Sequence, residues 1–284
     1  VYAKDLALWI MGMLREENVA YKSLEFHGEG VPALSIADRM TLANVTAEMG
    51  LKSAAFPPDD KLADYFGDYA VQGVWADRDA MYYKEFEVDL AQVIPLVMEV
   101  GEINEIKAPG EWGRLEIQQG LIGACASGRL EDLRVVAGIL DGKKIASGFQ
   151  LSIVPASREI YLQAIQEGII DRLVKSGASI LGSSCGPCLG SSHMIMADTR
   201  RFITTVNSNS MRRLSAIGVE KYVASPATVA MTALTGVLTV EVERTDAKYP
   251  YWEMPKVWVT VNEFERRYHN RVWNYGDLNS IACE

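Results

Sequence analysis

Hydrophobic residues recur along this chain at two spacings, and these spacings separate helices from strands. Apolar residues three or four positions apart predict helices over residues 4–18, 35–49, 61–66, 130–140, 159–176 and 228–238. Shorter apolar runs predict strands over residues 21–26, 86–88, 115–122, 147–154, 178–181 and 201–205. A chain that contains both kinds of element throughout is expected to be an α/β protein.

The order of these elements predicts two domains and a tail. From residue 115 onward strands and helices alternate, which is typical of βαβ units and a largely parallel sheet. The polar stretch 102–111, which contains a Pro-Gly pair, is expected to be a linker. We therefore predict two doubly wound, largely parallel α/β domains over residues 1–107 and 108–240. The aromatic and charged tail 241–284 follows neither spacing and receives no fold prediction.

Three loops of the second half each follow a predicted strand. They cover residues 123–129, 182–192 and 206–213. In a parallel sheet the carboxyl ends of the strands meet at one edge, and ligands bind there. We therefore expect these loops to carry the residues that bind a ligand or take part in catalysis.

Composition and charge exclude several classes of function. Hydrophobic residues make up 49% and charged residues 23% of the 284 residues, as in ordinary globular proteins. No apolar run reaches the ~20 residues that span a bilayer, so no membrane partner is expected. The net charge of −9 argues against nucleic-acid binding, which rewards basic surfaces. Four cysteines are too few for a disulfide framework, which favours a reducing, cytoplasmic location.

Three of the cysteines fall in the strand-end loops. Cys185 and Cys188 share one Cys-Gly-Pro-Cys turn, and Cys125 lies 60 residues earlier. Three thiolates could hold three irons of a 4Fe–4S cluster and leave the fourth iron open as a Lewis acid. The spacing alone also fits a zinc half-site completed by His193, a redox dithiol, or buried thiols.

Longer motifs around these cysteines narrow the choice. Residues 121–133 (LIGACASGRLEDL) and 154–190 (VPASREIYLQAIQEGIIDRLVKSGASILGSSCGPCLG) resemble the two cluster loops of the aconitase superfamily, in its isopropylmalate and homoaconitate dehydratase branch. The resemblance runs from about residue 1 to about residue 240. It implies the second and third α/β domains of that family and a 4Fe–4S cluster bound by Cys125, Cys185 and Cys188.

A segment of the first half also resembles a motif of this family. Residues 40–48 (MTLANVTAE) are similar to its MTICNMSAE-like helix. The resemblance implies that Asn44 is an amide beside the cluster and that Glu48 is the carboxylate of an acid–base pair. Residues four positions apart share one helix face, so both would point into one cleft. Helix geometry alone would favour a solvated helix face for these two residues.

The last strand-end loop both follows the family and departs from it. Residues 205–213 (TVNSNSMRR) resemble its TSNRNFEGR loop. The resemblance implies that Asn207 is a second amide near the cluster and that Arg213 binds a substrate carboxylate through its bidentate fork. Ser208, however, stands where the family has another substrate-binding arginine, and Ser210 replaces an aromatic residue. The loss of a guanidinium predicts a different substrate, a charge supplied by a partner, or a site without activity.

The remaining histidines and cysteine carry weaker expectations. His27 lies in a strand-end turn and is expected to be structural. His193 follows the Cys-Gly-Pro-Cys turn and could line the site, whereas His269 is expected to face solvent. Cys283 lies outside the matching region and is not expected to bind the cluster.

The resemblance covers only the middle of the family's domain order. It begins in the second domain, so the His, Asp and Ser groups of the first domain have no equivalent here. Residues 271–277 (RVWNYGD) resemble the opening of the swivelling domain, which often forms a separate small subunit.

The activity that the resemblance implies is a hydro-lyase. It would act on a hydroxy di- or tricarboxylic acid such as isopropylmalate or homoaconitate, together with a small-subunit partner and a source of the first domain. The alternative is a non-catalytic scaffold or regulatory subunit. RNA binding, known in one branch of the family, is a third option that the acidic composition disfavours.

Overall fold

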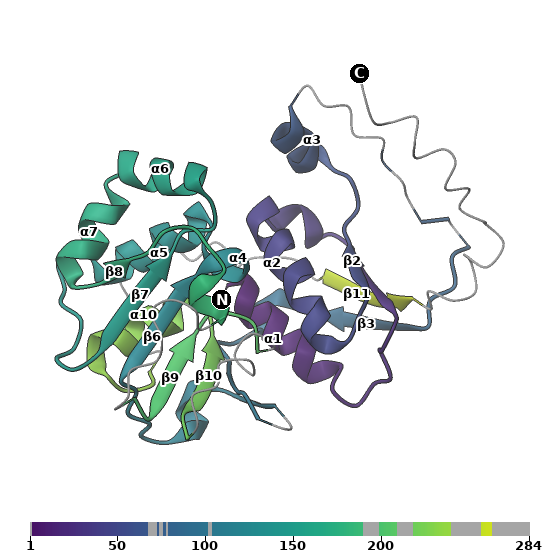
Figure 1. Cartoon of the computed structure of the whole chain (residues 1–284). Coiled ribbons are helices and arrows are strands. Elements are labelled where there is room, and N and C mark those ends of the chain that lie inside the picture. Colours follow the sequence, from purple (N-terminus) through teal and green to yellow (C-terminus); the bar gives the residue numbers. More distant parts are fainter. Residues whose placement is uncertain are drawn as a thin grey trace.

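The computed structural model describes residues 2–67, 73, 76–77, 79–101, 104–189, 199–208, 218–239 and 257–262. These residues form two β-sheets with their helices (Figure 1). We call the four-stranded sheet with α1 and α2 the first unit, and the seven-stranded sheet with its helices the second unit. None of the described helices combines the length and the apolar character that crossing a bilayer requires.

The sheet of the first unit has the strand order β2-β1-β11-β3. Strands β1 and β2 are parallel, and β11 lies antiparallel between β1 and β3. The sheet is therefore mixed rather than largely parallel, because β11 runs antiparallel to both of its neighbours. Strand β11 comes from the tail, for which no fold was predicted. The strands are β1 (Ser23–His27), β2 (Ser53–Ala55), β3 (Lys84–Val88) and β11 (Val257–Asn262).

Helices α1 (Ala3–Met13) and α2 (Ile36–Thr46) form the core of the first unit with this sheet. Leu6 and Ile10 of α1 and Leu42 of α2 pack with strand residues in one buried cluster. Ser35 and Asp38 begin α2 with reciprocal side-chain caps, which satisfy backbone N–H groups that a helix start leaves unpaired. The predicted helix 35–49 continues beyond α2 as the short 3-10 helix η2 (Ala47–Met49), and α3 (Asp60–Phe66) follows in the chain.

The sheet of the second unit has the strand order β5-β4-β10-β9-β6-β7-β8. The strands from β10 to β8 are parallel, and β4 and β5 pair antiparallel at one edge. The predicted α/β fold is confirmed, and the sheet of this unit is largely parallel. The strands are β4 (Val97–Glu99), β5 (Glu105–Lys107), β6 (Gln119–Gly123), β7 (Gln150–Val154), β8 (Ser179–Ile180), β9 (Arg201–Thr204) and β10 (Glu220–Ala224).

Strands β4 and β5 bear on the predicted division of the chain. The sequence placed a boundary near residue 107, within a linker over 102–111. Both strands nevertheless belong to the second sheet, and β5 ends at Lys107. The linker also includes the start of the 3-10 helix Pro109–Trp112. The polar composition of an exposed edge strand is what made this stretch resemble a linker. The domain ranges themselves remain a prediction.

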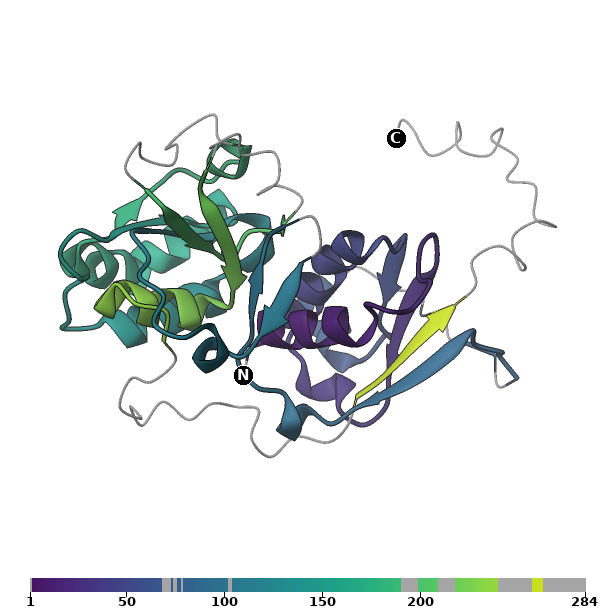
Figure 2. The same cartoon turned by 90° about the horizontal axis from the view of Figure 1, so that it is seen from below.

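Alternation along the strands gives the second sheet two buried faces. Ile122, Ile153 and Ile203 pack with α5, α7 and α10 on one face. Their chain neighbours, such as Leu121 and Phe202, point to the other face, where Leu8 of α1 joins them. Helix α1 therefore packs on both units, and α1 and α2 lie on the side of the first unit that faces the second (Figures 1 and 2).

The helices of the second unit largely match their predicted ranges. Helix α5 (Leu130–Leu140) has the predicted bounds, and α10 (Pro226–Thr235) begins two residues earlier than expected. The predicted helix 159–176 is two helices, α6 (Arg158–Gln166) and α7 (Ile169–Ser176). Gly168 separates them at a φ of 67°, a left-handed conformation that interrupts a helix.

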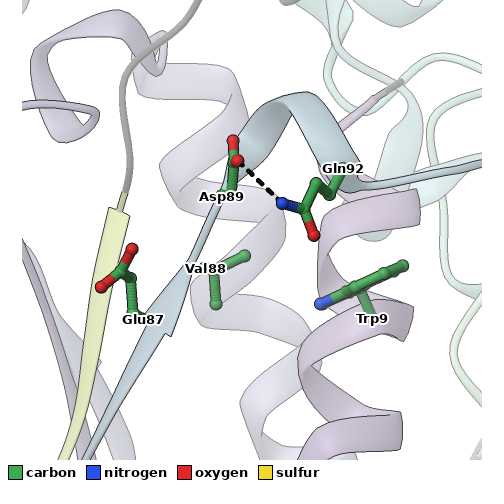
Figure 3. A pocket seen from close by; sticks show the side chains of 5 residues that line it. All are labelled: Trp9, Glu87, Val88, Asp89 and Gln92. Atoms are coloured by element: carbon green, nitrogen blue, oxygen red, sulfur yellow. Dashed lines mark hydrogen bonds between the residues drawn. The ribbon is translucent and has the colours of Figure 1, made fainter.

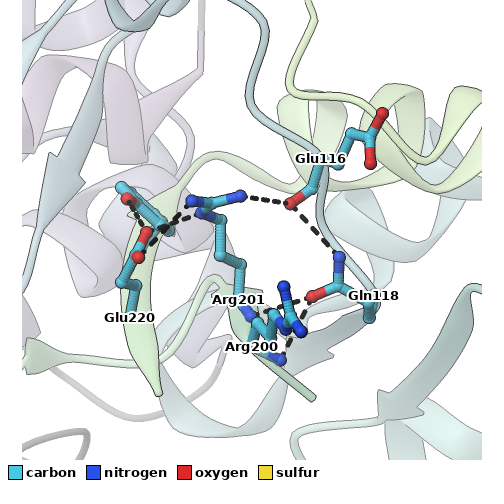
Figure 4. Close-up of polar contacts among 6 residues, drawn as sticks. Glu116, Gln118, Arg200, Arg201 and Glu220 are labelled. Atoms are coloured by element: carbon cyan, nitrogen blue, oxygen red, sulfur yellow. Dashed lines mark hydrogen bonds and ion pairs between the residues drawn. The ribbon is translucent and has the colours of Figure 1, made fainter. Parts of the chain in front are cut away.

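Polar contacts fix the strands at the end of the sheet opposite the candidate loops. Arg201 at the start of β9 donates to the Glu220 carboxylate of β10 at 2.6 and 3.4 Å (Figure 4). The Gln118 side-chain oxygen accepts from the backbone N–H groups of Arg200 and Arg201 at 3.2 and 2.9 Å. These contacts hold β6, β9 and β10 in register and so position the loops at their other ends.

Candidate functional site

The loop that carries Cys125 leaves β6 in a tightly constrained path. Gly123 has a φ of 117° and Ala124 a φ of 56°, both in the left-handed region. A Cβ on Gly123 would overlap the backbone carbonyl of Val154 at the end of β7, and one on Gly128 would lie 2.6 Å from the same oxygen. The loop therefore packs backbone to backbone against β7. Cys125, the second residue of α4 (Ala124–Ser127), is exposed.

The Cys-Gly-Pro-Cys turn lies at the end of β8. Cys185 is exposed, and Cys188 is buried in the short helix α8 (Gly186–Leu189). Cys188 belongs to the same apolar cluster as Ala124 and Val154, beside the Cys125 loop. Burial, followed by the charges of Cys125 and Cys185, raises the pKa of the Cys188 thiol to about 11. The three side chains therefore lie close enough to influence one another electrostatically.

Two amides connect the first unit to the loop after β9. The Asn207 Nδ2 group donates to the Asn44 Oδ1 atom of α2 at 2.7 Å. The Lys4 ammonium group of α1 donates to the Asn207 Oδ1 atom at 3.1 Å. Both asparagines are partly buried, and Lys4 is 2% exposed. The structure thus brings together the two amides that the sequence analysis identified. It also places Lys4 beside them, a residue that the sequence analysis did not identify.

Glu48 and Ser208 form a second contact between the same two segments. The buried Ser208 hydroxyl donates to the Glu48 Oε2 atom in a short hydrogen bond. Glu48 lies in η2, one turn beyond Asn44, so both residues of the predicted helix face do meet the loop after β9. Ser208, which replaces an arginine of the motif that this loop resembles, donates to a carboxylate and supplies no positive charge.

Helix α2 also contacts the Cys125 loop directly. The Thr41 hydroxyl donates to the Ala126 carbonyl at 3.1 Å and accepts from Arg129 Nη1 at 3.2 Å. On the other side of the loop, the Gly123 backbone N–H donates to Thr205 Oγ1 at 2.8 Å. The loop is therefore held between α2 and β9, and the candidate residues of both units share one region at the carboxyl edge of the second sheet.

Several predicted residues cannot be compared with the structure. Arg213, His193, His269 and Cys283 lie outside the described residues, as do residues 271–277. His27 is in β1, where its ring stacks on Tyr82 at 6.0 Å and its buried Nε2 atom has no hydrogen-bond partner among the described residues. This placement, away from the cysteines, agrees with a structural role.

Two observations concern where the described residues could bind a single metal ion or a small molecule. Within the described part of the chain, no group of three or more His, Cys, Asp or Glu side chains converges on a single ion. A shallow pocket of about 190 Å³ lies elsewhere, lined by Trp9, Glu87, Val88, Asp89 and Gln92 (Figure 3). Figure 3 shows the hydrogen bond that Gln92 donates to Asp89 among these lining residues, and none of the candidate site residues lines the pocket.

Sequence reasoning missed three residues that hold the site. Lys4, Arg129 and Thr205 all donate to or accept from site segments. One signal was available for Lys4, which stands four residues before Leu8 on the apolar face of a helix. A charged residue in that position is rarely buried without a partner. Thr205 and Arg129 gave no comparable signal, because threonine and arginine are common in exposed loops.

Asp132, near this region, predicts a pH dependence of stability. Its carboxylate accepts from the Arg129 backbone N–H at 3.1 Å, and burial raises its pKa from 3.8 to about 7. The folded chain therefore binds this proton more tightly than the unfolded chain. Its stabilising contribution is complete below the unfolded pKa and is lost as the pH rises through about 7.

Replacing Asp132 with asparagine, Asp132→Asn, removes this titration but keeps an oxygen that can accept from Arg129. We expect the free energy of unfolding to fall with pH between about 4 and 7 in the original chain, and to fall less in the variant. Urea unfolding at several pH values measures both curves. Asp5, whose pKa burial raises to about 6, is present in both chains and contributes the same slope to both curves. Parallel curves would therefore contradict the assignment to Asp132.

The chain is thus an α/β protein with a candidate metal site at the carboxyl edge of its parallel strands. The site contains three thiols, two amides and a carboxylate. The aconitase family (aconitate hydratase) matches residues 1–102 and 98–236 of this chain. The chain belongs to the aconitase family.

Individual relatives support the same assignment. The 3-isopropylmalate dehydratase large subunits of Clostridium beijerinckii and Clostridium botulinum are 41% and 40% identical to this chain over 243 residues. Each match covers 84% of this chain and 58% of the relative. The probable methanogen homoaconitase large subunit of Methanosarcina mazei is 40% identical over 242 residues, covering 84% and 61%. The chain thus spans about three fifths of the length of these curated relatives.

Proposed function

We propose that this chain carries the iron–sulfur half of the active site of a hydro-lyase. Cys125, Cys185 and Cys188 would bind a 4Fe–4S cluster. The observation that carries this proposal is the position of these thiols at the sheet edge where the Asn44–Asn207 and Glu48–Ser208 pairs also lie. The names of the relatives, which are dehydratase and homoaconitase large subunits, support it.

The donor set fits such a cluster better than it fits a single ion. Each thiolate of a cubane binds a different iron, so the sulfurs do not need to converge on one point. Cys188 lies in an apolar cluster, and Cys125 and Cys185 are exposed. When bound, the cluster would supply an iron without a protein ligand, which can polarise a substrate hydroxyl.

Glu48 would handle the proton that accompanies the leaving hydroxyl. A carboxyl group held in a fixed orientation can protonate a leaving group during dehydration. Ser208 fixes the carboxylate by donating to Oε2. Asn44 and Asn207, joined by their own hydrogen bond, would offer amide donors to the substrate beside the cluster.

The substrate class would be a hydroxy di- or tricarboxylic acid such as isopropylmalate or homoaconitate. Arg213, outside the described residues, would bind a remote carboxylate through its planar guanidinium group. Because Ser208 contacts Glu48 and brings no cation, a second carboxylate would need a positive charge from a partner. The partners would be a small subunit with the swivelling domain, and a source of the family's first domain. The enzyme would work in the cytoplasm.

A non-catalytic scaffold is the second candidate function. Ser208 favours it, since the arginine that it replaces would bind substrate. The contacts of Asn44, Glu48 and Asn207 oppose it, because they join residues to which the family resemblance gives roles in a hydro-lyase site.

The test is to reconstitute the chain with iron and sulfide and to add a small subunit and the amino-terminal segment of a large-subunit relative. We expect dehydration of isopropylmalate or homoaconitate that requires these partners. We also expect the EPR signal of the reduced cluster to change when the substrate is added to the chain alone. A stable cluster with no turnover and an unchanged signal would instead support the scaffold.

A further inference from the structure

We propose that Lys4 is a positioning residue that fixes the direction in which the two site amides present their hydrogen-bond donors. This inference deepens the proposed function and rests on it. Its observation is a continuous chain of contacts. Lys4 Nζ donates to Asn207 Oδ1 at 3.1 Å, and Asn207 Nδ2 donates to Asn44 Oδ1 at 2.7 Å. The chain joins α1, the loop after β9 and α2.

The direction follows from the chemistry of the first member. A lysine ammonium group has three donors and no acceptor, whereas an asparagine amide has a donor end and an acceptor end. Lys4 can therefore contact only the oxygen of Asn207, which turns the Asn207 NH₂ group toward Asn44. That NH₂ group can contact only the oxygen of Asn44. The Asn44 NH₂ group is then the end that remains to be directed into the site.

Without Lys4, the same pair of amides has two arrangements of similar energy. Both asparagines could turn over together and keep a hydrogen bond between them, because the two ends of an amide have almost the same shape. A turned amide would present an oxygen where the proposed substrate or a sulfur of the cluster needs a donor. Lys4 thus selects one arrangement, and this is a preorganisation of the kind that catalytic sites use.

Burial of the ammonium group also indicates a function. A buried cation is unfavourable unless opposite charges and hydrogen bonds surround it. Lys4 is 2% exposed, and the charged groups around it are Glu48, Cys125, Asp132 and, opposing them, Arg129. Three of these groups are acidic, and one of them is a proposed ligand of the cluster. The positive charge therefore lies where an anionic cluster and an anionic substrate would be stabilised.

Anchoring of α1 is the alternative role, and the next residue in the chain already performs it. The Asp5 carboxylate accepts from the backbone N–H groups of Tyr2 at 3.0 Å and Leu96 at 3.3 Å, and it contacts Ser225. Asp5 is 0% exposed and lies in the same helical turn as Lys4. A matched pair of variants can therefore separate loosening of the helix from loss of the amide direction.

The experiment compares Lys4→Met, Lys4→Arg and Asp5→Asn in the metal-free chain. Side-chain ¹⁵N–¹H spectra report the NH₂ groups of Asn207 and Asn44, which are assigned through Asn207→Asp and Asn44→Asp. Methionine keeps the length of the lysine but neither its donors nor its charge. We expect hydrogen exchange of the Asn207 NH₂ group to accelerate at least about tenfold in Lys4→Met, the factor for one ordinary hydrogen bond. Lys4→Arg, a donor-only replacement, should restore most of the protection.

The control defines the contrary result. Asp5→Asn should destabilise the chain in urea while leaving the exchange of the two amides near its original rate. Unchanged exchange in Lys4→Met, or an equal acceleration in Asp5→Asn, would overturn the inference. Because no metal is present, these results stand whether or not the chain binds a cluster. In the reconstituted chain, Lys4→Met should also shift the midpoint potential of the cluster to more negative values, since a nearby positive charge is lost.

Discussion

Serine in place of Cys125 or Cys185 is expected to abolish cluster binding and to lower turnover more than about 100-fold. Mutation of a residue that only hydrogen-bonds to a metal ligand typically lowers metal affinity or activity roughly 10–100-fold. Loss of a ligand itself should therefore exceed that range. Both cysteines are exposed, so neither change opens a cavity in the core. Iron and sulfide analysis after reconstitution, together with dehydration assays in the presence of the partners, measures the effect.

Two further serine variants make this result specific. Cys283→Ser should keep both the iron content and the turnover, because Cys283 is not expected to be a ligand. Cys188→Ser should lose the cluster and also some stability, since it places a hydroxyl in the apolar layer with Ala124 and Val154. Full iron content in the Cys125 and Cys185 variants would show that these thiols do not hold the cluster.

Gly123→Ala is expected to have the largest effect on folding. Its methyl group would overlap the Val154 carbonyl, and alanine is strained at a φ of 117°. The end of β7 would have to separate from the Cys125 loop, and Ala156 N, which donates to Gly128 at 2.8 Å, would move with it. Strain and overlap together should lower the free energy of unfolding by roughly 3–5 kcal/mol, or prevent folding.

Gly138→Ala is the matched control for this change. Gly138 lies in the exposed part of α5, and a Cβ there would meet nothing within 4 Å. Alanine in a helix interior is favoured over glycine by roughly 0.5–1 kcal/mol, so this variant should be slightly more stable. Urea unfolding compares the two. Equal stability of the two variants would mean that the Cys125 loop is not held against β7 as described.

Local patterns allowed much of the second unit to be predicted. Helix α5 has its predicted bounds because Leu133, Val136 and Leu140 repeat at helical spacing and are all 0% exposed. The parallel strands β6, β7 and β9 follow from apolar runs buried on both faces. The loops after these strands meet because parallel strands end at one edge, which is a property of the fold and does not depend on details of the sequence.

The parts that could not be predicted depend on contacts between distant segments. Strand β11 pairs residues 258–262 with 23–27, and its position in the middle of the first sheet has no local signal. The contact of Lys4 with Asn207 spans 203 positions, and that of Ser208 with Glu48 spans 160. Sequence identified Asn207, Ser208 and Glu48 as candidates, but their pairing is set by how α1 and α2 pack against the second unit.

The Glu48–Ser208 contact changes the meaning of the missing arginine. An arginine at position 208 would carry a full charge toward the carboxylate, whereas Ser208 donates a single neutral hydrogen bond. In the proposed hydro-lyase, the site would therefore keep an oriented acid and lack a cation. We expect this exchange to weaken substrate binding while leaving proton transfer in place, which is why the proposed partner must contribute positive charge.

Anaerobic iron and sulfide analysis with EPR, on the chain reconstituted with both elements, tests the central claim most directly. The account predicts about four irons and four sulfides per chain, and an EPR signal that a hydroxy-dicarboxylate changes. A chain that binds no iron, or that takes up zinc instead, would contradict the iron–sulfur site and with it the proposed hydro-lyase activity.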